Sequence, residues 1–271
     1  MSAARTLFCT ASICALLASP LPAQGLFDGD IITAEVLPGW REEGMGHMAA
    51  IRLTLEQGWK TYWRAPGDAG IPPIFEFGSS ENLASLRPHW PVPEIFDQGG
   101  MRSIGYEREV IIPLYLTRRD ADAPIRVSGT LHVGVCEEVC VPAQLPIDVV
   151  LPAQGAADAE ISAALADRPM TEAEARVGAV TCAVTPTENG LSLTVRAELP
   201  AIGAAEEVAI ETADPTVWVA EPSVTRADDV LTAQTDLVRY NAEPFAFDRS
   251  GLRMTVFAAG AAVDIRGCTG G

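Results

Sequence analysis

From about residue 30 onward, apolar and polar residues alternate in short runs along the chain. Alternation with a period of two is the pattern of half-buried β-strands. Segments rich in Gly and Pro, such as 65–70 and 96–100, separate the runs and predict turns. Because no rhythm of strand and helix interrupts them, the runs predict an all-β fold of the sandwich type. Pro113 indicates that its own run is an edge strand or contains a bulge. In the first half of the chain the alternating runs are residues 51–55, 110–116, 125–135 and 141–149.

A change of composition divides the chain. Residues 153–176 are rich in Ala, Asp and Glu, and Ile161 and Leu165 stand at helical spacing, so this segment is predicted to be a linker with a short helix. Strand-like runs resume after it, and a Glu-Asn-Gly turn between two of them predicts a hairpin. We therefore expect a first β-sandwich at residues 24–152 and a second, smaller β-sandwich at residues 177–271. The later runs are residues 180–184, 191–195, 208–210, 217–219, 252–256 and 263–265.

Residues 1–23 have the features of a secretory signal peptide. Arg5 supplies a positive charge, residues 7–18 form an apolar stretch, and a small residue precedes the predicted cut. Cleavage removes Cys9 and Cys14 with the peptide. Export predicts a periplasmic mature protein. Since no internal stretch reaches the roughly 18–20 apolar residues that span a bilayer, we expect it to be soluble, with no transmembrane segment of its own.

The charge of the chain narrows its partners. The sequence has 19 Lys and Arg against 36 Asp and Glu, a formal net charge of −17. Such an excess of negative charge excludes a mainly electrostatic DNA- or RNA-binding protein. Lys60 is the only lysine, so the chain has no Lys-rich tail, and no nucleic-acid partner is expected.

Four cysteines remain after cleavage, and in an exported chain they predict disulfides. Three pairings are possible, and the spacing favours Cys136 with Cys140 and Cys182 with Cys268. A bridge from Cys182 to Cys268 closes a loop of roughly 90 residues, which stabilises by about 4–5 kcal/mol in the chain-entropy model. We therefore predict a structural disulfide there, with a second redox pair as the alternative.

The closer pair, Cys136 and Cys140, cannot bridge within one extended strand, which would hold the two residues about 13 Å apart. The two can bridge across a hairpin whose tip is residues 137–139. Apolar residues alternate on both sides of this tip, which supports the hairpin. The same alternation places both cysteines together on the polar face of the strands, exposed and away from the core.

A disulfide that closes so short a loop adds little stability, because the entropy removed from the unfolded chain grows with loop length. A redox role for this pair is therefore favoured over a structural one, which remains the alternative. Glu137 and Glu138 lie between the two cysteines, and their negative charges disfavour a thiolate at either one. The pair is thus predicted to relay electrons to a partner rather than to act as a general nucleophile.

Two segments resemble the N-terminal periplasmic domain of the thiol:disulfide interchange protein DsbD, and they are closest to its ScsB-type branch. The segments are Gly-Trp-Lys-Thr-Tyr-Trp-Arg-Ala-Pro-Gly-Asp-Ala-Gly-Ile-Pro-Pro at 58–73 and Cys-Glu-Glu-Val-Cys-Val-Pro at 136–142. The resemblance extends over about residues 30–151. It implies an immunoglobulin-like redox sandwich that acts as a thiol:disulfide oxidoreductase. Such a domain passes electrons to periplasmic isomerases, reductases, or cytochrome c maturation or copper-tolerance thiols. Packing in the sandwich core and in support of the cap is expected for Trp59, Tyr62 and Trp63 of the first segment, with a ligand groove as the alternative.

The resemblance also implies roles for single residues. Cys140 would be the thiol that meets the partner, and Cys136 the resolving thiol. A cap loop at 95–106 would shield the disulfide, with Phe96 as its aromatic cap and Tyr106 near its end. The three residues between the cysteines depart from the five of the best-known members. Without transmembrane or thioredoxin-like domains, the chain is expected to need a separate membrane donor of the DsbD or CcdA type. Its other partners would be periplasmic thioredoxin-like proteins, and no cofactor is implied.

Copper binding is the main alternative. Cys136 and Cys140 with His132 form a set of soft-metal ligands, and residues 45–48 add a Met and His cluster. In a strand, however, His132 would lie about 13 Å from Cys136, too far for shared coordination, so no metal site is predicted. The other alternative is a non-catalytic immunoglobulin-like interaction protein with a structural disulfide.

Overall fold

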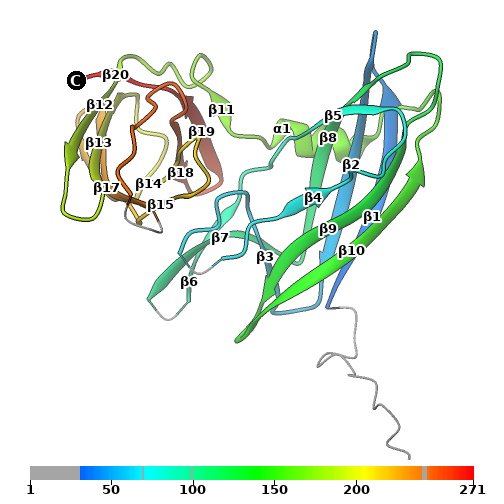
Figure 1. The fold of residues 1–271 in the computed structure, drawn as a ribbon, viewed down its shortest axis with the longest axis horizontal. Helices are drawn as coiled ribbons and strands as arrows, with labels where there is room; N and C mark the ends of the chain where they lie inside the picture. The colour runs from blue at the N-terminus through cyan, green and yellow to red at the C-terminus, as the bar shows by residue number, and fades with distance from the viewer. Residues whose placement is uncertain (1–30, 69, 99, 240–242) are drawn as a thin grey trace, which may run out of the picture. The chain divides into compact units, whose positions relative to one another are not determined.

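The strands of the first half form two β-sheets (Figure 1). The structure is a computed structural model that describes residues 31–68, 70–98, 100–239 and 243–271, so the predicted signal peptide lies outside the described residues. In spatial order, the first sheet consists of β1 (Ile32–Arg41), β2 (Gly46–Leu55), β8 (Glu109–Arg118) and β5 (Leu83–Pro88). The second consists of β10 (Cys140–Val150), β9 (Arg126–Cys136), β3 (Lys60–Tyr62), β7 (Met101–Glu107) and β6 (Glu94–Gln98), with β4 (Ile74–Glu76) paired to β9.

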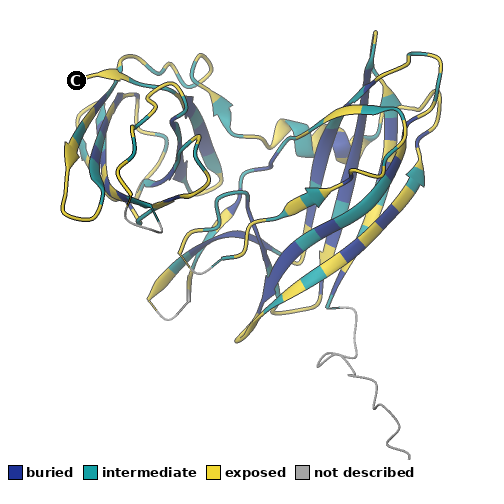
Figure 2. Ribbon diagram, viewed as in Figure 1, coloured by how far each residue is buried: buried dark blue, intermediate teal, exposed yellow. Residues whose placement is uncertain are grey.

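The inner faces of these two sheets share one hydrophobic core. Ile51 of β2 and Ile112 of β8 are buried in it from one sheet, and Leu131 and Val133 of β9 from the other. Alternate positions contribute because successive side chains of a strand point to opposite faces. Figure 2 shows this alternation of exposed and less exposed positions along β10. The two sheets are therefore a β-sandwich.

A short helix, α1 (Ala159–Ala166), follows this sandwich. Asp158 is its N-cap, and the side chain accepts hydrogen bonds from two backbone amides of the first turn. Ile161 is fully buried and packs against Leu37 and Ala50 of the first sandwich. A short helix is thus present within residues 153–176, as expected.

The remaining strands form a second pair of sheets around a second core. Leu193 and Val195 are buried in it from one sheet, and Val256 from the other. A disulfide joins the fully buried Cys182 to Cys268. One sheet consists of β11 (Met170–Thr171), β19 (Ala261–Arg266), β18 (Arg253–Ala258) and β14 (Glu207–Glu211). The other consists of β15 (Val217–Val219), β17 (Val230–Arg239), β13 (Leu191–Glu198), β12 (Val180–Pro186) and β20 (Thr269–Gly270), with β16 (Ser223–Ala227) paired to β17.

The all-β class and the sandwich architecture predicted from the alternation are confirmed, as are the hairpins β9–β10 and β12–β13. The strand that contains Pro113, β8, was expected to be an edge strand or to contain a bulge. The expectation of an edge strand is wrong, since β8 lies between β2 and β5. A proline lacks the backbone N–H but keeps its carbonyl as an acceptor. The carbonyl of Pro113 accepts a hydrogen bond from the amide of His89, just beyond β5. The runs expected from the sequence do not include β1, β3 to β7, β11, β16, β17 or β20.

Residues 31–271 form one compact unit. The boundaries expected at residues 24–152, 153–176 and 177–271 stay predictions. Among the described residues, no helix combines the length and the apolar character needed to cross a membrane.

Candidate redox site

A disulfide joins the two strands of the β9–β10 hairpin at its tip. Cys136, the last residue of β9, pairs in register with Cys140, the first residue of β10, and the structure contains the bond between their sulfurs. Residues 137–139 form the turn between them. The turn thus brings together two residues that one extended strand would hold about 13 Å apart.

The two cysteines differ in exposure. Cys136 is 1% exposed, whereas Cys140 is exposed. Both lie on the face opposite that of the core residue Val135, but the expectation that both are exposed is wrong for Cys136. The reason is sheet order, because β9 lies between β10 and β3, and side chains of β3 cover Cys136. The disulfide is therefore open to solvent on the Cys140 side.

Tyr62 of β3 contacts both sulfurs. Its hydroxyl oxygen lies 2.5 Å from Sγ of Cys136 and 3.2 Å from Sγ of Cys140. Tyr62 is buried, and burial raises the pKa of its phenol, so the hydroxyl is protonated at neutral pH and can donate a hydrogen bond to sulfur. The ring has room because Gly134 of β9 has no side chain: a Cβ there would lie 3.1 Å from ring carbons.

Lys60 lies between the β9–β10 hairpin and the β6–β7 hairpin. It pairs in register with Cys136, and its ammonium is 3.6 Å from a carboxylate oxygen of Glu107. The same ammonium lies 4.7 Å from the centroid of the Phe96 ring, a cation–π contact. Phe96, the expected cap residue, is therefore held beside the strand that covers Cys136.

Tyr106, the second expected cap residue, lies in the core of the first sandwich. It pairs with Thr61, the neighbour of Tyr62, so its side chain points to the face opposite the disulfide. Tyr106 is buried, and its hydroxyl donates a hydrogen bond to the carbonyl of Pro91 at 2.9 Å. The structure thus corrects its place from the cap to the core.

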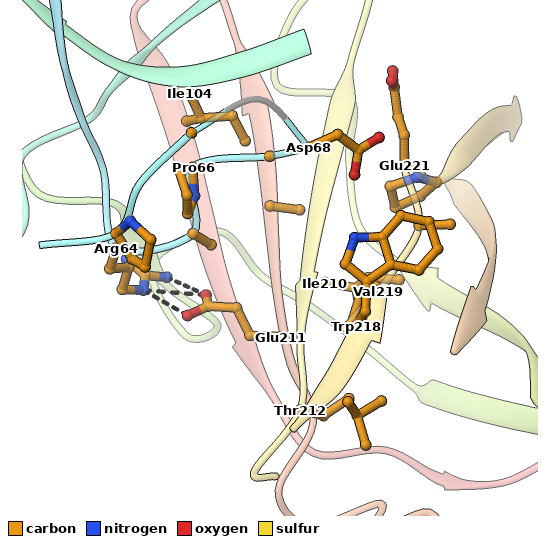
Figure 3. Close-up of a pocket in the computed structure, with 18 of the residues that line it drawn as sticks. Arg64, Pro66, Asp68, Ile104, Ile210, Glu211, Thr212, Trp218, Val219 and Glu221 are labelled. Carbon is orange, nitrogen blue, oxygen red and sulfur yellow. Dashed lines mark hydrogen bonds and ion pairs between the residues drawn. The ribbon is translucent and has the colours of Figure 1, made fainter. Parts of the chain in front are cut away.

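A cleft of about 790 Å³ lies beside the segment that follows Tyr62 (Figure 3). Residues 64–68 and Gly70 line one wall, and residues of β14 and β15, including the exposed Trp218, line the other. Arg64 donates hydrogen bonds to Glu211 across it. From the sequence a packing role is expected for Tyr62 and none is assigned to Arg64, because only the folded sheets bring these side chains to the disulfide and the cleft.

The residues of the copper alternative do not converge. His132 lies on β9, four positions before Cys136, and its Nε2 is 2.9 Å from a carboxylate oxygen of Glu76. His47 is buried in β2, with Nε2 2.7 Å from the carbonyl oxygen of Pro38. In the described part of the chain, no group of three or more His, Cys, Asp or Glu side chains is placed to hold a metal ion.

Fold and site together define an all-β protein whose first sandwich presents a hairpin disulfide with one open and one covered cysteine. Residues 33–152 match the family described as "Thiol:disulfide interchange protein DsbD, N-terminal". The resemblance seen in the sequence is therefore confirmed for this part of the chain.

One solved structure extends the likeness of fold to the second half. The N-terminal periplasmic domain of ScsB from Proteus mirabilis matches with a TM-score of 0.67 and 22% identity, over 91% of this chain and 96% of that one. A protein of unknown function from Porphyromonas gingivalis W83 matches with a TM-score of 0.21 and 10% identity, over 86% of this chain and 99% of that one. A TM-score this low does not indicate a shared fold. A search of curated proteins gave no match.

Proposed function

We propose that the chain is a periplasmic thiol–disulfide relay in which Cys136 and Cys140 carry the electrons. The observation that supports this most directly is the asymmetry of the pair, with Cys140 exposed and Cys136 buried against the Tyr62 hydroxyl. A disulfide that served stability alone would gain little from so short a loop. An open sulfur joined to a covered one suits exchange with a partner protein.

In the proposed reaction, a partner thiolate attacks Sγ of Cys140. The bond between Cys136 and Cys140 breaks, a new disulfide joins the partner to Cys140, and the electron pair goes to Sγ of Cys136. The Tyr62 hydroxyl, 2.5 Å from that sulfur, donates a hydrogen bond to the developing thiolate. A second thiol of the partner then attacks the mixed disulfide and releases Cys140. The chain is now a dithiol, and the partner a disulfide.

The reverse sequence delivers the electrons. Cys140 attacks the disulfide of an acceptor, and Cys136 resolves the mixed disulfide by attacking Cys140. We propose a membrane protein of the DsbD or CcdA type as the donor and periplasmic thioredoxin-like proteins as acceptors. In this scheme Phe96 shields the pair between encounters, and Cys182–Cys268 is a structural disulfide outside the exchange.

The proposal is tested by trapping. In Cys136→Ala the resolving thiol is absent, so an oxidised thioredoxin-like partner should remain attached to Cys140 as a mixed disulfide on a non-reducing gel. The matched control, Cys140→Ala, should trap far less, because Cys136 is buried. A reduction potential of the Cys136–Cys140 pair far below about −300 mV, with no trapped partner, would overturn the relay and favour a structural disulfide.

A further inference from the structure

Strand β14 (Glu207–Glu211) belongs to the second sandwich but contributes to both cores. Val208 and Ile210 are buried in the second core, whereas Ala209 packs in the core of the first sandwich. Because side chains alternate along a strand, Glu207 and Glu211 share the face of Ala209. They stand four residues apart, about 13 Å along the strand.

Each of these two glutamates holds one arginine of the first sandwich. Arg102 of β7 donates to Oε2 of Glu207 and to the carbonyl of Val208, both at 3.0 Å. Arg64, just after β3, donates from Nε to both carboxylate oxygens of Glu211 at 3.1 and 3.2 Å (Figure 3). Arg64 also donates to Oγ1 of Thr255 at 3.0 Å.

The two arginines lie on segments next to Tyr62: Arg64 follows β3, and Arg102 lies on β7, which pairs with β3. Arg64 is two residues after Tyr62, and its guanidinium lies over the ring of the intervening Trp63, 3.7 Å from the ring centroid. Trp63 in turn makes an edge-to-face contact with Phe257 of β18, with ring centroids 5.3 Å apart. Gly70 lies against the Tyr62 ring, since a Cβ there would lie 2.8 Å from a ring carbon. The strands are also joined here, as the amide of Trp63 donates to the carbonyl of Ile104 on β7 at 3.0 Å.

These ion pairs are better explained by a role in positioning side chains than by a contribution to stability. The side chains of Arg64 and Arg102 are only 11% and 12% exposed. Burial of charged groups costs free energy that the pairing offsets only in part, so buried ion pairs are weak evidence for stability. Their directional hydrogen bonds do define one position for each side chain.

We propose that β14 is a positioning element of the redox site: through Glu207–Arg102 and Glu211–Arg64 it fixes the backbone that holds the Tyr62 hydroxyl against the two sulfurs. The second sandwich thereby tunes the exchange reaction without touching the cysteines. This inference rests on the proposed function only in taking the Cys136–Cys140 pair as the redox centre.

The test compares the reduction equilibrium of the Cys136–Cys140 pair in the full chain with that in Glu207→Gln, Glu211→Gln and the double variant. Each protein is equilibrated in a glutathione redox buffer, alkylated, and the peptides with Cys136 and Cys140 are quantified. The Tyr62 hydrogen bond is stronger to a thiolate than to a disulfide, so misplacing it should lower the reduced-to-oxidised ratio about two- to tenfold. Tenfold corresponds to about 30 mV for a two-electron couple.

Two comparisons separate positioning from general destabilisation. In a Tyr62→Phe background the double variant should cause no further change, because the group that it positions is gone. Glu206→Gln is the matched control: Glu206 neighbours β14 and accepts from Arg226 at 2.7 Å, inside the second sandwich. It should lower the unfolding temperature and leave the redox ratio unchanged.

No shift in the variants, an equal shift in the Tyr62→Phe background, or an equal shift in Glu206→Gln would overturn the proposal. If the double variant does not fold, Glu207→Gln alone decides, since that carboxylate is 41% exposed and tolerates the change best. A wild-type pair that never exchanges with a partner would overturn the relay instead, while the shift in the glutathione equilibrium would still report on β14.

Discussion

Tyr62 is the residue whose role depends most on its surroundings. The sequence shows an aromatic residue among other aromatic residues, and packing is the ordinary expectation for it. In the structure, pairing of β3 with β9 brings its hydroxyl to both sulfurs, and burial raises the pKa of the phenol, so it remains a donor at neutral pH. The cysteines were predictable from spacing and turn geometry, whereas this donor was not.

Tyr62→Phe removes only the hydroxyl. We expect the Cys136–Cys140 pair to become harder to reduce, with a reduced-to-oxidised ratio about two- to tenfold lower, because the thiolate loses a hydrogen bond. Equilibration with glutathione measures this ratio. Tyr115→Phe, on β8 of the other sheet, is the control and should leave the reduced-to-oxidised ratio unchanged. An unchanged or higher ratio in Tyr62→Phe would contradict the role of the hydroxyl.

Asp264 of β19 should make stability depend on pH. Burial raises the pKa of its carboxyl, but hydrogen bonds from Arg253 at 2.6 and 2.9 Å outweigh burial and leave the pKa below the ordinary 3.8. A lowered pKa in the folded state adds stability above the unfolded pKa, and this is lost as pH falls through the folded value. Asp264→Asn should therefore be less stable than wild type at pH 7, and the difference should shrink below about pH 4.

Urea unfolding at pH 7 and pH 3 measures both differences. Asp122→Asn, at an exposed turn residue, serves as the control and should behave as wild type at both values. A deficit in Asp264→Asn that is as large at pH 3 as at pH 7 would show that the carboxylate charge is not the cause.

Among the elements, the β9–β10 hairpin was the most predictable. Its alternation extends over both arms, and the two cysteines match a short turn, so register and disulfide follow from local rules. β17 was missed although it lies inside its sheet between β15 and β13. Its buried positions include Ala233 and Thr235, which are small or polar, so the alternation is weak in the sequence. Only pairing on both sides makes that segment an inner strand.

Gly134→Ala tests how closely β9 and β3 approach at the site. A Cβ there would lie 2.6 Å from Cβ of Ile71 and 3.1 Å from the Tyr62 ring, so both must shift. We expect a loss of about 1–3 kcal/mol in the free energy of unfolding, together with a lower reduced-to-oxidised ratio of the cysteine pair. Gly78→Ala, where a Cβ meets nothing within 4 Å, should stay within about 0.5 kcal/mol of wild type. Equal effects of the two substitutions would contradict the argument.

For the whole molecule, the two disulfides should differ in stability and in redox behaviour. The Cys182–Cys268 bridge spans a sequence separation of 86, and that of Cys136–Cys140 spans 4. Removing both cysteines of the first should therefore cost roughly 4–5 kcal/mol in the free energy of unfolding, against about 2 kcal/mol for the second. Denaturant unfolding of the two double alanine variants measures the difference.

The same variants test the separation of roles. Cys182→Ala with Cys268→Ala should leave the reduction equilibrium of the Cys136–Cys140 pair unchanged, provided that the protein is still folded under the assay conditions. A changed equilibrium in the folded variant, or a larger loss of stability from the hairpin pair, would show that the division into one structural and one redox disulfide is wrong.

The sequence by itself determined the all-β class, the two cysteine-bearing hairpin arms and the short helix, because each depends on local periodicity and turn geometry. It also carried the likeness to the DsbD N-terminal family, which resides in two short segments. Only the tertiary structure decided that Cys136 is covered and Cys140 open, that Tyr62 serves the sulfurs while Tyr106 lies in the core, and that β14 holds two arginines beside the site. These facts depend on which strands become neighbours in the sheets. The alternation of apolar and polar residues along one strand does not specify which strand pairs with it.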